Sequence, residues 1–249
     1  MMSEIDTKAT VGEVAVKHPE AKLVFEKLGI DYCCGGAAAL EVAAEKSGHS
    51  VREVVSEIEK AIGAGEESPE DRKDWSEARA KDLAEHILGT HHVFMKSQLP
   101  RLTDLFEKVI AAHGEKHGEM LRSVREVFFD LKAEIEAHLM KEEQILFPYI
   151  LALDDYVTQG GARPVSHCGT VRNPIRQMEH EHENAGRALE WMRELTSDYA
   201  LPEDACASFE ALYEGLKQME ADLHEHIHLE NNVLFPKSEA LEDKALGEG

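Results

Sequence analysis

Two segments of the chain carry the same histidine and glutamate residues at the same spacing. His138 and Glu142 stand in the first segment. His226 and Glu230 stand in the second, each 88 positions further along, and in both segments an aliphatic residue and Leu-Phe-Pro follow. Residues four apart lie on one face of a helix. Two such faces brought together would offer two imidazoles and two carboxylates, which is a ligand set for metal ions.

The elements that must position these residues are predicted to be helices. From Trp75 onward apolar residues recur at steps of three and four, and no segment shows sustained strand alternation. The pattern predicts four long helical segments, at residues 75–112, 117–150, 172–197 and 203–238. The stretch 154–173 contains several glycine and proline residues and is predicted to be a crossover loop. One long and two short connections are typical of a four-helix bundle, so the predicted fold class is all-α.

Both His–Glu pairs fall on the apolar stripes that such a bundle would bury. In the second helical segment, the stripe that contains Ile135 continues through His138 and Glu142. In the fourth segment the stripe continues in the same way through His226 and Glu230. Burying an unpaired carboxylate costs several kcal/mol. Each glutamate must therefore be paired or must bind a metal ion.

The first and third helical segments each add one histidine to this set. His92 lies on the main apolar stripe of the first segment, and His182 lies on that of the third. Other histidines, among them His91 and His180, lie on other faces and are interpreted as surface groups or neighbours of the ligands. The predicted metal ligands are His92, His138, Glu142, His182, His226 and Glu230. The alternative, a set of satisfied core histidines and Glu–His pairs, fits the doubled pattern less well.

The doubled pattern predicts two metal ions rather than one. Four imidazoles and two carboxylates exceed the needs of one tetrahedral zinc ion, and the set contains no thiolate. Each ion would take two histidines, and Glu142 and Glu230 would bridge the ions. These ligands suit iron, with manganese or zinc as alternatives, and the His-x-x-x-Glu order differs from the Glu-x-x-His order of ferritin-like proteins. Glu134 and Asp222 stand one turn before the paired histidines, where they could orient imidazoles, line an access path or lie on an exposed face.

The N-terminal part of the chain is predicted to form a small helical module that ends near residue 62. Capping residues and glycine stops predict its helices, which would begin after Thr10, at Pro19, at Ala37 and after Ser50. The stretch 63–74 is rich in glycine, serine, proline and acidic residues, and it is interpreted as a linker.

Cys33 and Cys34 stand in the turn Asp31-Tyr-Cys-Cys-Gly-Gly, directly before the helix predicted to begin at Ala37. The dipole at the start of a helix lowers the pKa of a thiol and favours thiolate chemistry. The two cysteines are therefore predicted to pass iron or electrons, or to react with a thiol partner. The alternative is that they pack a tight turn. Cys168 and Cys206 are interpreted as ordinary packing or loop residues.

These motifs together resemble those of a known family. The His-x-x-x-Glu pairs with Leu-Phe-Pro resemble the hemerythrin-like domain. With the Cys-Cys-Gly-Gly turn and the stretch Glu181–Gly186, most of the chain resembles the iron–sulfur cluster repair di-iron proteins of the YtfE/ScdA type. The resemblance implies a hemerythrin-like four-helix bundle over 75–245, preceded by a small ScdA-like domain over 1–65. It also implies that the six predicted ligands hold two non-haem iron ions bridged by carboxylates. His167 and Cys168 in the crossover loop have no role that the resemblance explains.

The function that the resemblance implies is the repair of iron–sulfur clusters damaged by nitric oxide or peroxide, by delivery of iron during a stress response. The partners would be damaged iron–sulfur proteins, with NO or O₂ as small ligands of the iron. Two other functions fit the same ligands: a di-iron NO reductase, or a hemerythrin-type protein that binds or senses O₂ or NO. The chain is an enzyme only if NO is turned over, and its sequence is compatible with a monomer or a homodimer.

Composition narrows the choice of partners and compartment. The 249 residues carry a formal charge of −22, so the chain has no general electrostatic reason to bind nucleic acid or an anionic membrane. No apolar run approaches the ~18 residues that span a bilayer, and the first residues lack the apolar core of a secretory signal. Four cysteines are too few for a disulfide framework. We expect a protein of the reducing cytoplasm.

Overall fold

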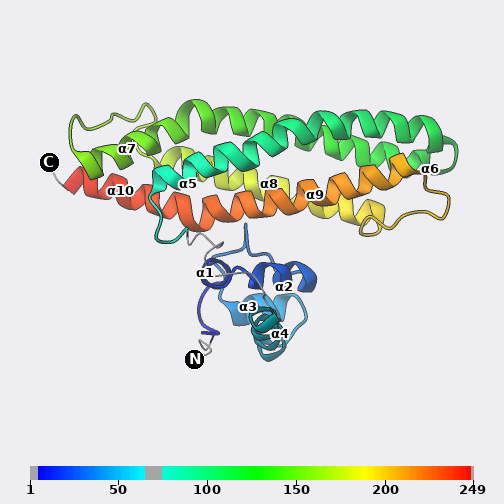
Figure 1. Cartoon of the computed structure of the whole chain (residues 1–249), viewed down its shortest axis with the longest axis horizontal. Coiled ribbons are helices and arrows are strands. Elements are labelled where there is room, and N and C mark those ends of the chain that lie inside the picture. Colours follow the sequence, from blue (N-terminus) through cyan, green and yellow to red (C-terminus); the bar gives the residue numbers. More distant parts are fainter. Residues whose placement is uncertain (1–4, 65–74, 248–249) are drawn as a thin grey trace.

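The computed structural model describes residues 5–64 and 75–247, and both ranges are helical (Figure 1). A long bundle is accompanied by a small group of four short helices, which lies against one side of it. Within these ranges there is no β-strand, and the only β-bridge joins Thr10 and Ala39. No helix in the described ranges is both long and apolar enough to cross a bilayer. The predicted architecture, an all-α bundle preceded by a small helical domain, is confirmed.

The bundle consists of α-helices interrupted by short π-helical turns. In chain order its elements are α5 (Ala80–Ile87), η2 (Leu88–His92), α6 (Val93–Lys141), η3 (Glu142–Leu146), α7 (Phe147–Gln159), α8 (Arg172–Thr196), α9 (Ala207–Leu229), η4 (Glu230–Leu234) and α10 (Phe235–Gly247). Three of the four arms of the bundle run through a π-helical turn without a break, and the arm formed by α8 has none.

Helix α6 contains the first reversal of the chain. Arg125 Nε donates to Glu107 Oε1 over 3.0 Å, and the ring centroids of Phe106 and Phe128 are 5.0 Å apart. In a straight helix, residues 18 apart would be separated by about 27 Å. The chain therefore doubles back within α6, at one end of the bundle (Figure 1). The sequence predicted both arms, but the non-helical connection expected near residues 113–116 is replaced by continuous helical structure.

The crossover loop is shorter than predicted. Helix α7 continues up to Gly160, which ends it with a positive φ of 77° that suits glycine. The additional residues of α7 are held by Asp154, which is buried and accepts a hydrogen bond from Arg79 Nε over 2.9 Å. The loop therefore begins at Gly160 instead of Asp154. The bundle also begins at Ala80 rather than at 75, and its last helix ends at Gly247 rather than at 238.

Two apolar clusters pack along the bundle, and the predicted ligands lie between them. One cluster is built mainly from α6, α8 and α9, and it includes Phe106 and Leu131. The other is built from α5, α7, the start of α8, η4 and α10, and it includes Ile87 and Ile150. In each arm, the residues of the two clusters flank the predicted ligand along the chain. Hydrocarbon therefore encloses the polar layer from both ends.

The π-helical turns coincide with predicted ligands. Element η3 begins at Glu142, η4 begins at Glu230, and η2 ends at His92. Elements η3 and η4 occupy corresponding positions, so the 88-residue repeat of the sequence extends to the backbone. A π-turn is rare within an α-helix and occurs frequently at functional sites. The backbone thus marks the same level of the bundle as the side-chain pattern does.

The N-terminal module has a core of its own, formed by the buried apolar residues of its helices. These helices are α1 (Val11–Lys17), α2 (Ala21–Leu28), α3 (Leu40–Lys46) and α4 (Val51–Ala64). The predicted capping box of Thr10 and Glu13 is present, and Gly29 ends α2 with a φ of 65°. Of the predicted linker, residues 65–74 lie outside the described ranges.

Helix α3 begins later than predicted. The sequence favoured a start at Ala37, but the helix begins at Leu40. The preceding residues are held in a different pairing, because Val11 N donates to Ala38 O over 2.9 Å and Leu40 N donates to Ala9 O over 3.0 Å. The cysteine pair is consequently separated from the first turn of α3.

Candidate metal centre

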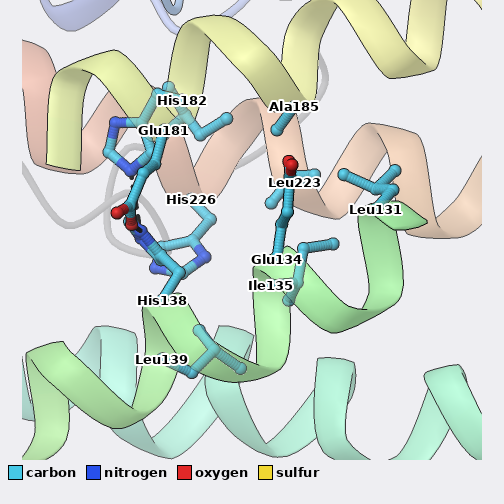
Figure 2. Close-up of a pocket in the computed structure, with 11 residues that line it drawn as sticks. Leu131, Glu134, Ile135, His138, Leu139, Glu181, His182, Ala185, Leu223 and His226 are labelled. Atoms are coloured by element: carbon cyan, nitrogen blue, oxygen red, sulfur yellow. Dashed lines mark hydrogen bonds and ion pairs between the residues drawn. The ribbon is translucent and has the colours of Figure 1, made fainter. Parts of the chain in front are cut away.

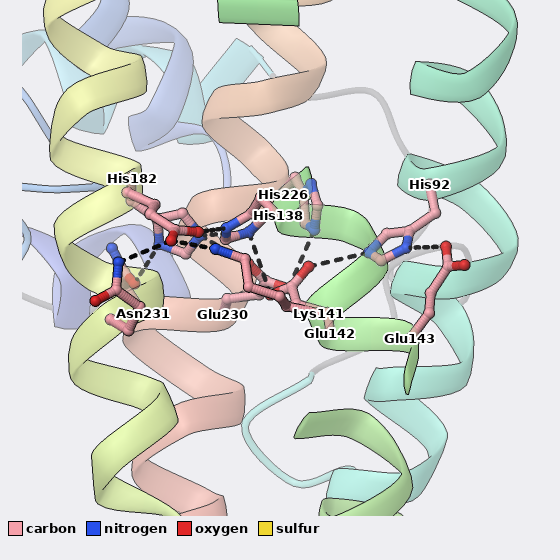
Figure 3. A network of polar contacts seen from close by, with 11 residues as sticks. His92, His138, Lys141, Glu142, Glu143, His182, His226, Glu230 and Asn231 are labelled. Atoms are coloured by element: carbon pink, nitrogen blue, oxygen red, sulfur yellow. Dashed lines mark hydrogen bonds and ion pairs between the residues drawn. The ribbon is translucent and has the colours of Figure 1, made fainter. Parts of the chain in front are cut away.

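Six buried side chains from the four arms of the bundle meet at one level (Figure 3). Their polar atoms form two groups, and within each group one ligand atom per residue lies within 4.8 Å of the others. The groups are His92, Glu142, His226 and Glu230, and His138, Glu142, His182 and Glu230. The structure brings together all six residues that the sequence singled out, and it places both glutamates in both groups.

All four imidazoles turn their Nε2 atoms toward the glutamates. The Nε2-to-oxygen distances are His92–Glu142 3.4 Å, His138–Glu142 3.3 Å, His182–Glu230 3.1 Å and His226–Glu230 3.1 Å. The two oxygens of Glu142 meet histidines of different groups, and so do the two oxygens of Glu230. This is the arrangement expected of carboxylates that bridge two metal ions.

Both glutamates are completely buried and short of hydrogen bonds. Among the described residues, neither oxygen of Glu142 has a hydrogen-bond partner, and Oε2 of Glu230 and Nε2 of His92 have none. A buried carboxylate without a partner costs several kcal/mol. Cations held within the groups would satisfy these atoms, and the imidazole and carboxylate donors suit iron, manganese or zinc. The residues present therefore fit bound metal.

The electrostatics of the two groups favour positive charge. Burial opposes protonation of His138, but the charge of Glu142 and of other nearby carboxylates raises the pKa of His138 to about 10. Burial likewise opposes ionisation of Glu230, but His226 and His182 hold its pKa well below the usual range. Glu142 thus helps to keep a proton on His138. A bound metal cation would supply this positive charge instead and would release the proton.

Two of the histidines have hydrogen-bond partners at their Nδ1 atoms, and the sequence did not predict these partner residues. His92 Nδ1 lies 2.8 Å from Glu143, and His182 Nδ1 lies 2.8 Å from Asn231. Glu143 and Asn231 directly follow the two shared glutamates, so they are one more pair related by the 88-residue repeat. Such contacts fix the tautomer and orientation of a metal-binding imidazole. The repeat therefore carried a signal that would have found both residues.

The other two histidines, His138 and His226, have different neighbours. His138 Nδ1 lies 2.9 Å from Glu181. Glu181 directly precedes the predicted ligand His182 in the sequence. In the first arm, His91 directly precedes His92 in the same way, and its ring stacks on His226 with a centroid distance of 5.4 Å. Among the described residues, His226 Nδ1 has no hydrogen-bond partner. His91 is buried as a neighbour of the ligands, and Asp222, whose role was open, lies 3.0 Å from His91 Nδ1.

A small cavity lies beside the second group (Figure 2). It measures about 20 Å³, which is room for one water-sized molecule. His138, His182 and His226 line it together with several aliphatic side chains and Glu134. Glu134 is also exposed. Of the alternatives left open for this residue, the geometry therefore favours the lining of an access path.

The cysteine turn of the N-terminal module lies directly against this part of the bundle. The Cys34 thiol donates to the His182 carbonyl oxygen over 3.4 Å. Asn231 Nδ2 donates to the Cys33 carbonyl oxygen over 3.2 Å, while Oδ1 of the same side chain meets His182. One asparagine thus connects a predicted ligand to the cysteine turn. Two remote segments of the sequence are joined here by a chain of hydrogen bonds.

A second asparagine secures the contact between module and bundle. Asn232 Nδ2 donates to the Tyr32 carbonyl oxygen over 3.2 Å. Its side chain lies so close to Gly12 and Gly36 that a Cβ at either position would come within 2.4 Å of Asn232 Oδ1. The Gly-Gly of the cysteine turn therefore permits this close approach.

The predicted lowering of the thiol pKa is wrong for Cys33. The turn does not lie at a helix start, so no helix dipole acts on it. A hydrogen bond to Cys34, burial, and the charges of Cys34 and Asp31 raise the pKa of Cys33 well above its ordinary value. The remaining cysteines, Cys168 and Cys206, are exposed, and neither belongs to a candidate metal group in the described ranges.

Taken together, the fold and the site define a hemerythrin-like bundle with a buried site suited to cations. A family model described as the hemerythrin HHE cation binding domain matches residues 83–238, and the ScdA_N domain of unknown function matches residues 7–62. The chain is 38% identical over 230 residues to the iron-sulfur cluster repair protein YtfE of Pectobacterium carotovorum subsp. carotovorum, covering 92% of this chain and 96% of that protein. It is 38% identical over 229 residues to the probable iron-sulfur cluster repair protein of Haemophilus influenzae, covering 91% and 95%. The chain belongs to the family of iron–sulfur cluster repair proteins.

Replacing Asn231 with alanine is expected to lower metal affinity by about 10- to 100-fold, because the imidazole of His182 loses the partner of its Nδ1 atom. The measurement is competition for ferrous iron against a chromophoric chelator. Asn232→Ala is the matched control, since it removes contacts with the cysteine turn but none with His182. Equal affinities of the two variants would contradict the role of Asn231.

Proposed function

We propose that the protein is a non-haem di-iron protein that repairs damaged iron–sulfur clusters by donating iron. The observation that carries the proposal is the pair of ligand groups that share Glu142 and Glu230. Among the described residues, both oxygens of Glu142 and Oε2 of Glu230 have no hydrogen-bond partner. Two groups that share two carboxylates suit two ions held close together, and their donors suit iron. The relatives are named as iron–sulfur cluster repair proteins. We therefore infer that the recipients are iron–sulfur proteins damaged by nitric oxide or peroxide during stress.

The residues of the chain have distinct tasks in this proposal. Bound iron supplies open coordination positions for small ligands, and as cargo it is the ion passed on. The six ligands hold it, and Glu143, Glu181 and Asn231 keep three imidazoles oriented toward it. The apolar clusters on both sides keep bulk water away. We assign transfer of iron, or thiol chemistry with a partner, to Cys33 and Cys34, which lie beside His182.

The proposal is tested with an iron–sulfur enzyme that has been inactivated by NO. Iron-loaded and metal-free forms of the protein are incubated with it in the absence of other iron. The loaded form is expected to restore activity and the metal-free form is not. Equal failure of the two forms would refute iron donation.

A second candidate function is the reduction of NO at the same centre. The small cavity beside His138 favours it, because a molecule the size of NO could reach the second ligand group there. Anaerobic NO added to the reduced protein should then yield N₂O over many turnovers. Uptake of NO in a stoichiometric amount without N₂O would eliminate this function. Reversible O₂ binding would instead favour a carrier or sensor, and rapid irreversible oxidation would count against one.

We place this activity in the cytoplasm. All four cysteines are free, and thiols persist in a reducing compartment.

A further inference from the structure

A second set of metal-binding side chains lies in the cysteine turn, outside the bundle. One carboxylate oxygen of Asp31 and the Sγ atoms of Cys33 and Cys34 lie within 4.8 Å of one another. The two sulfurs are 3.8 Å apart, and Cys33 Sγ is 3.4 Å from Asp31 Oδ1. Both cysteines are free. Three donor atoms from four consecutive residues therefore converge without a disulfide.

The backbone of the turn holds these donors in place. Asp31 Oδ1 accepts hydrogen bonds from the backbone N–H groups of Cys33 and Cys34, over 3.1 and 2.9 Å. Cys33 is buried, Cys34 is half-buried and Asp31 is exposed. The neighbours of the Cys33 sulfur are electron-rich, so ionisation of its thiol is opposed by Asp31 and Cys34. A cation among the three donors reverses this opposition, because it favours the thiolate and compensates the carboxylate.

We propose that Asp31, Cys33 and Cys34 form a second metal site, which binds one divalent cation of borderline softness such as Fe²⁺ or Zn²⁺. Thiolates and carboxylates are both ligands that such ions accept. The two thiols each release a proton to solvent as the metal–sulfur bonds form, and the oxidation state of the metal does not change. Three protein ligands leave one position of a tetrahedral site open to water or to a ligand from another molecule.

The site lies between the bundle and the solvent. The Cys34 thiol contacts the carbonyl of His182, and a Cβ at Gly186 would make an ordinary van der Waals contact with Cys34 Sγ at 3.7 Å. Gly186 itself places no side chain against the sulfur. On the other side the site ends at the exposed Asp31. We infer that iron leaving the bundle is held here for a recipient, an inference that rests on the proposed function.

The test is a titration of Co²⁺ into the chain whose bundle site is already filled with iron. Cobalt bound by thiolates has a charge-transfer absorption in the near ultraviolet, and the six ligands of the bundle include no thiol. We expect one equivalent of cobalt to produce this band. Cys33→Ser and Cys34→Ser should abolish or halve it, and Cys206→Ser is the matched control that should retain it in full. Asp31→Asn should weaken binding about tenfold or more.

Asp31→Asn is expected to keep the fold of the turn, because the amide oxygen of asparagine can accept hydrogen bonds from the same backbone N–H groups. Absence of the band, or an unchanged band in Cys33→Ser, would overturn the site, as would unchanged affinity in Asp31→Asn. Failure of the proposed function has a different signature, since the band would form while the iron-loaded protein failed to restore the damaged enzyme. Full repair by Cys33→Ser together with Cys34→Ser would overturn only the inferred role in iron release.

Discussion

Glu142→Gln is expected to lower the metal affinity of both ligand groups by about 100-fold or more, so that the purified variant retains at most one iron ion per chain. Glu142 belongs to both groups, and its two oxygens meet His92 and His138 separately. A neutral amide is a poor bridge between cations, since it lacks the charge and offers one oxygen instead of two. The measurement is elemental analysis of metal per chain together with the absorption spectrum.

The matched control for this change is Glu143→Gln, at the next position of the same π-turn. Glu143 reaches His92 only at the outward Nδ1 atom, 2.8 Å away, and is not a member of either group. We expect a loss of about tenfold or more, confined to the group that contains His92. The bridging assignment would be wrong if Glu142→Gln kept two irons per chain with an unchanged spectrum.

Removal of metal is expected to lower the melting temperature by about 8–16 °C. Iron present at about 1,000 times its dissociation constant stabilises the folded chain by about 4 kcal/mol. For a chain of this size, 1 kcal/mol corresponds to about 2–4 °C. The effect arises because Glu142 and Glu230 are buried and, among the described residues, three of their four oxygens have no hydrogen-bond partner. Thermal unfolding followed by circular dichroism, with and without chelator, measures it.

The stabilisation should depend on the shared carboxylates. In Glu142→Gln the difference between chelated and iron-supplemented samples should shrink, because less metal binds at the same concentration. Identical melting temperatures of the wild-type chain with and without metal would show that the six residues are a satisfied polar core instead.

Sequence periodicity predicted the core positions because the four arms bury continuous apolar stripes. His92 and His182 were chosen from neighbouring histidines on that basis, and both reach the site. Their binding of metal stays a prediction. The π-turns were not predicted, because the sequence pattern was read with a constant 3.6 residues per turn, which describes only regular α-helix. The wide turn that ends at His92 also explains why two consecutive histidines, His91 and His92, are both buried.

The cysteine turn shows where local reasoning was insufficient. Its expected thiol chemistry rested on a helix start at Ala37, but long-range pairing moves the start to Leu40. The contacts of the turn with His182 and Asn231 join segments about 150 and 200 residues apart. Such contacts depend on how module and bundle pack, which neither periodicity nor capping signals describe.

The crossover loop contains none of the six ligands, and it divides the bundle into two halves with equal contributions. The half before residue 160 supplies His92, His138 and Glu142, and the half after residue 171 supplies the other three. Neither half can complete a ligand group alone. Bound metal would therefore link the two halves. We expect the halves of a metal-loaded chain to remain associated after cleavage of the loop. In this sense the two halves of the single chain contribute to the site as the two subunits of a dimer would.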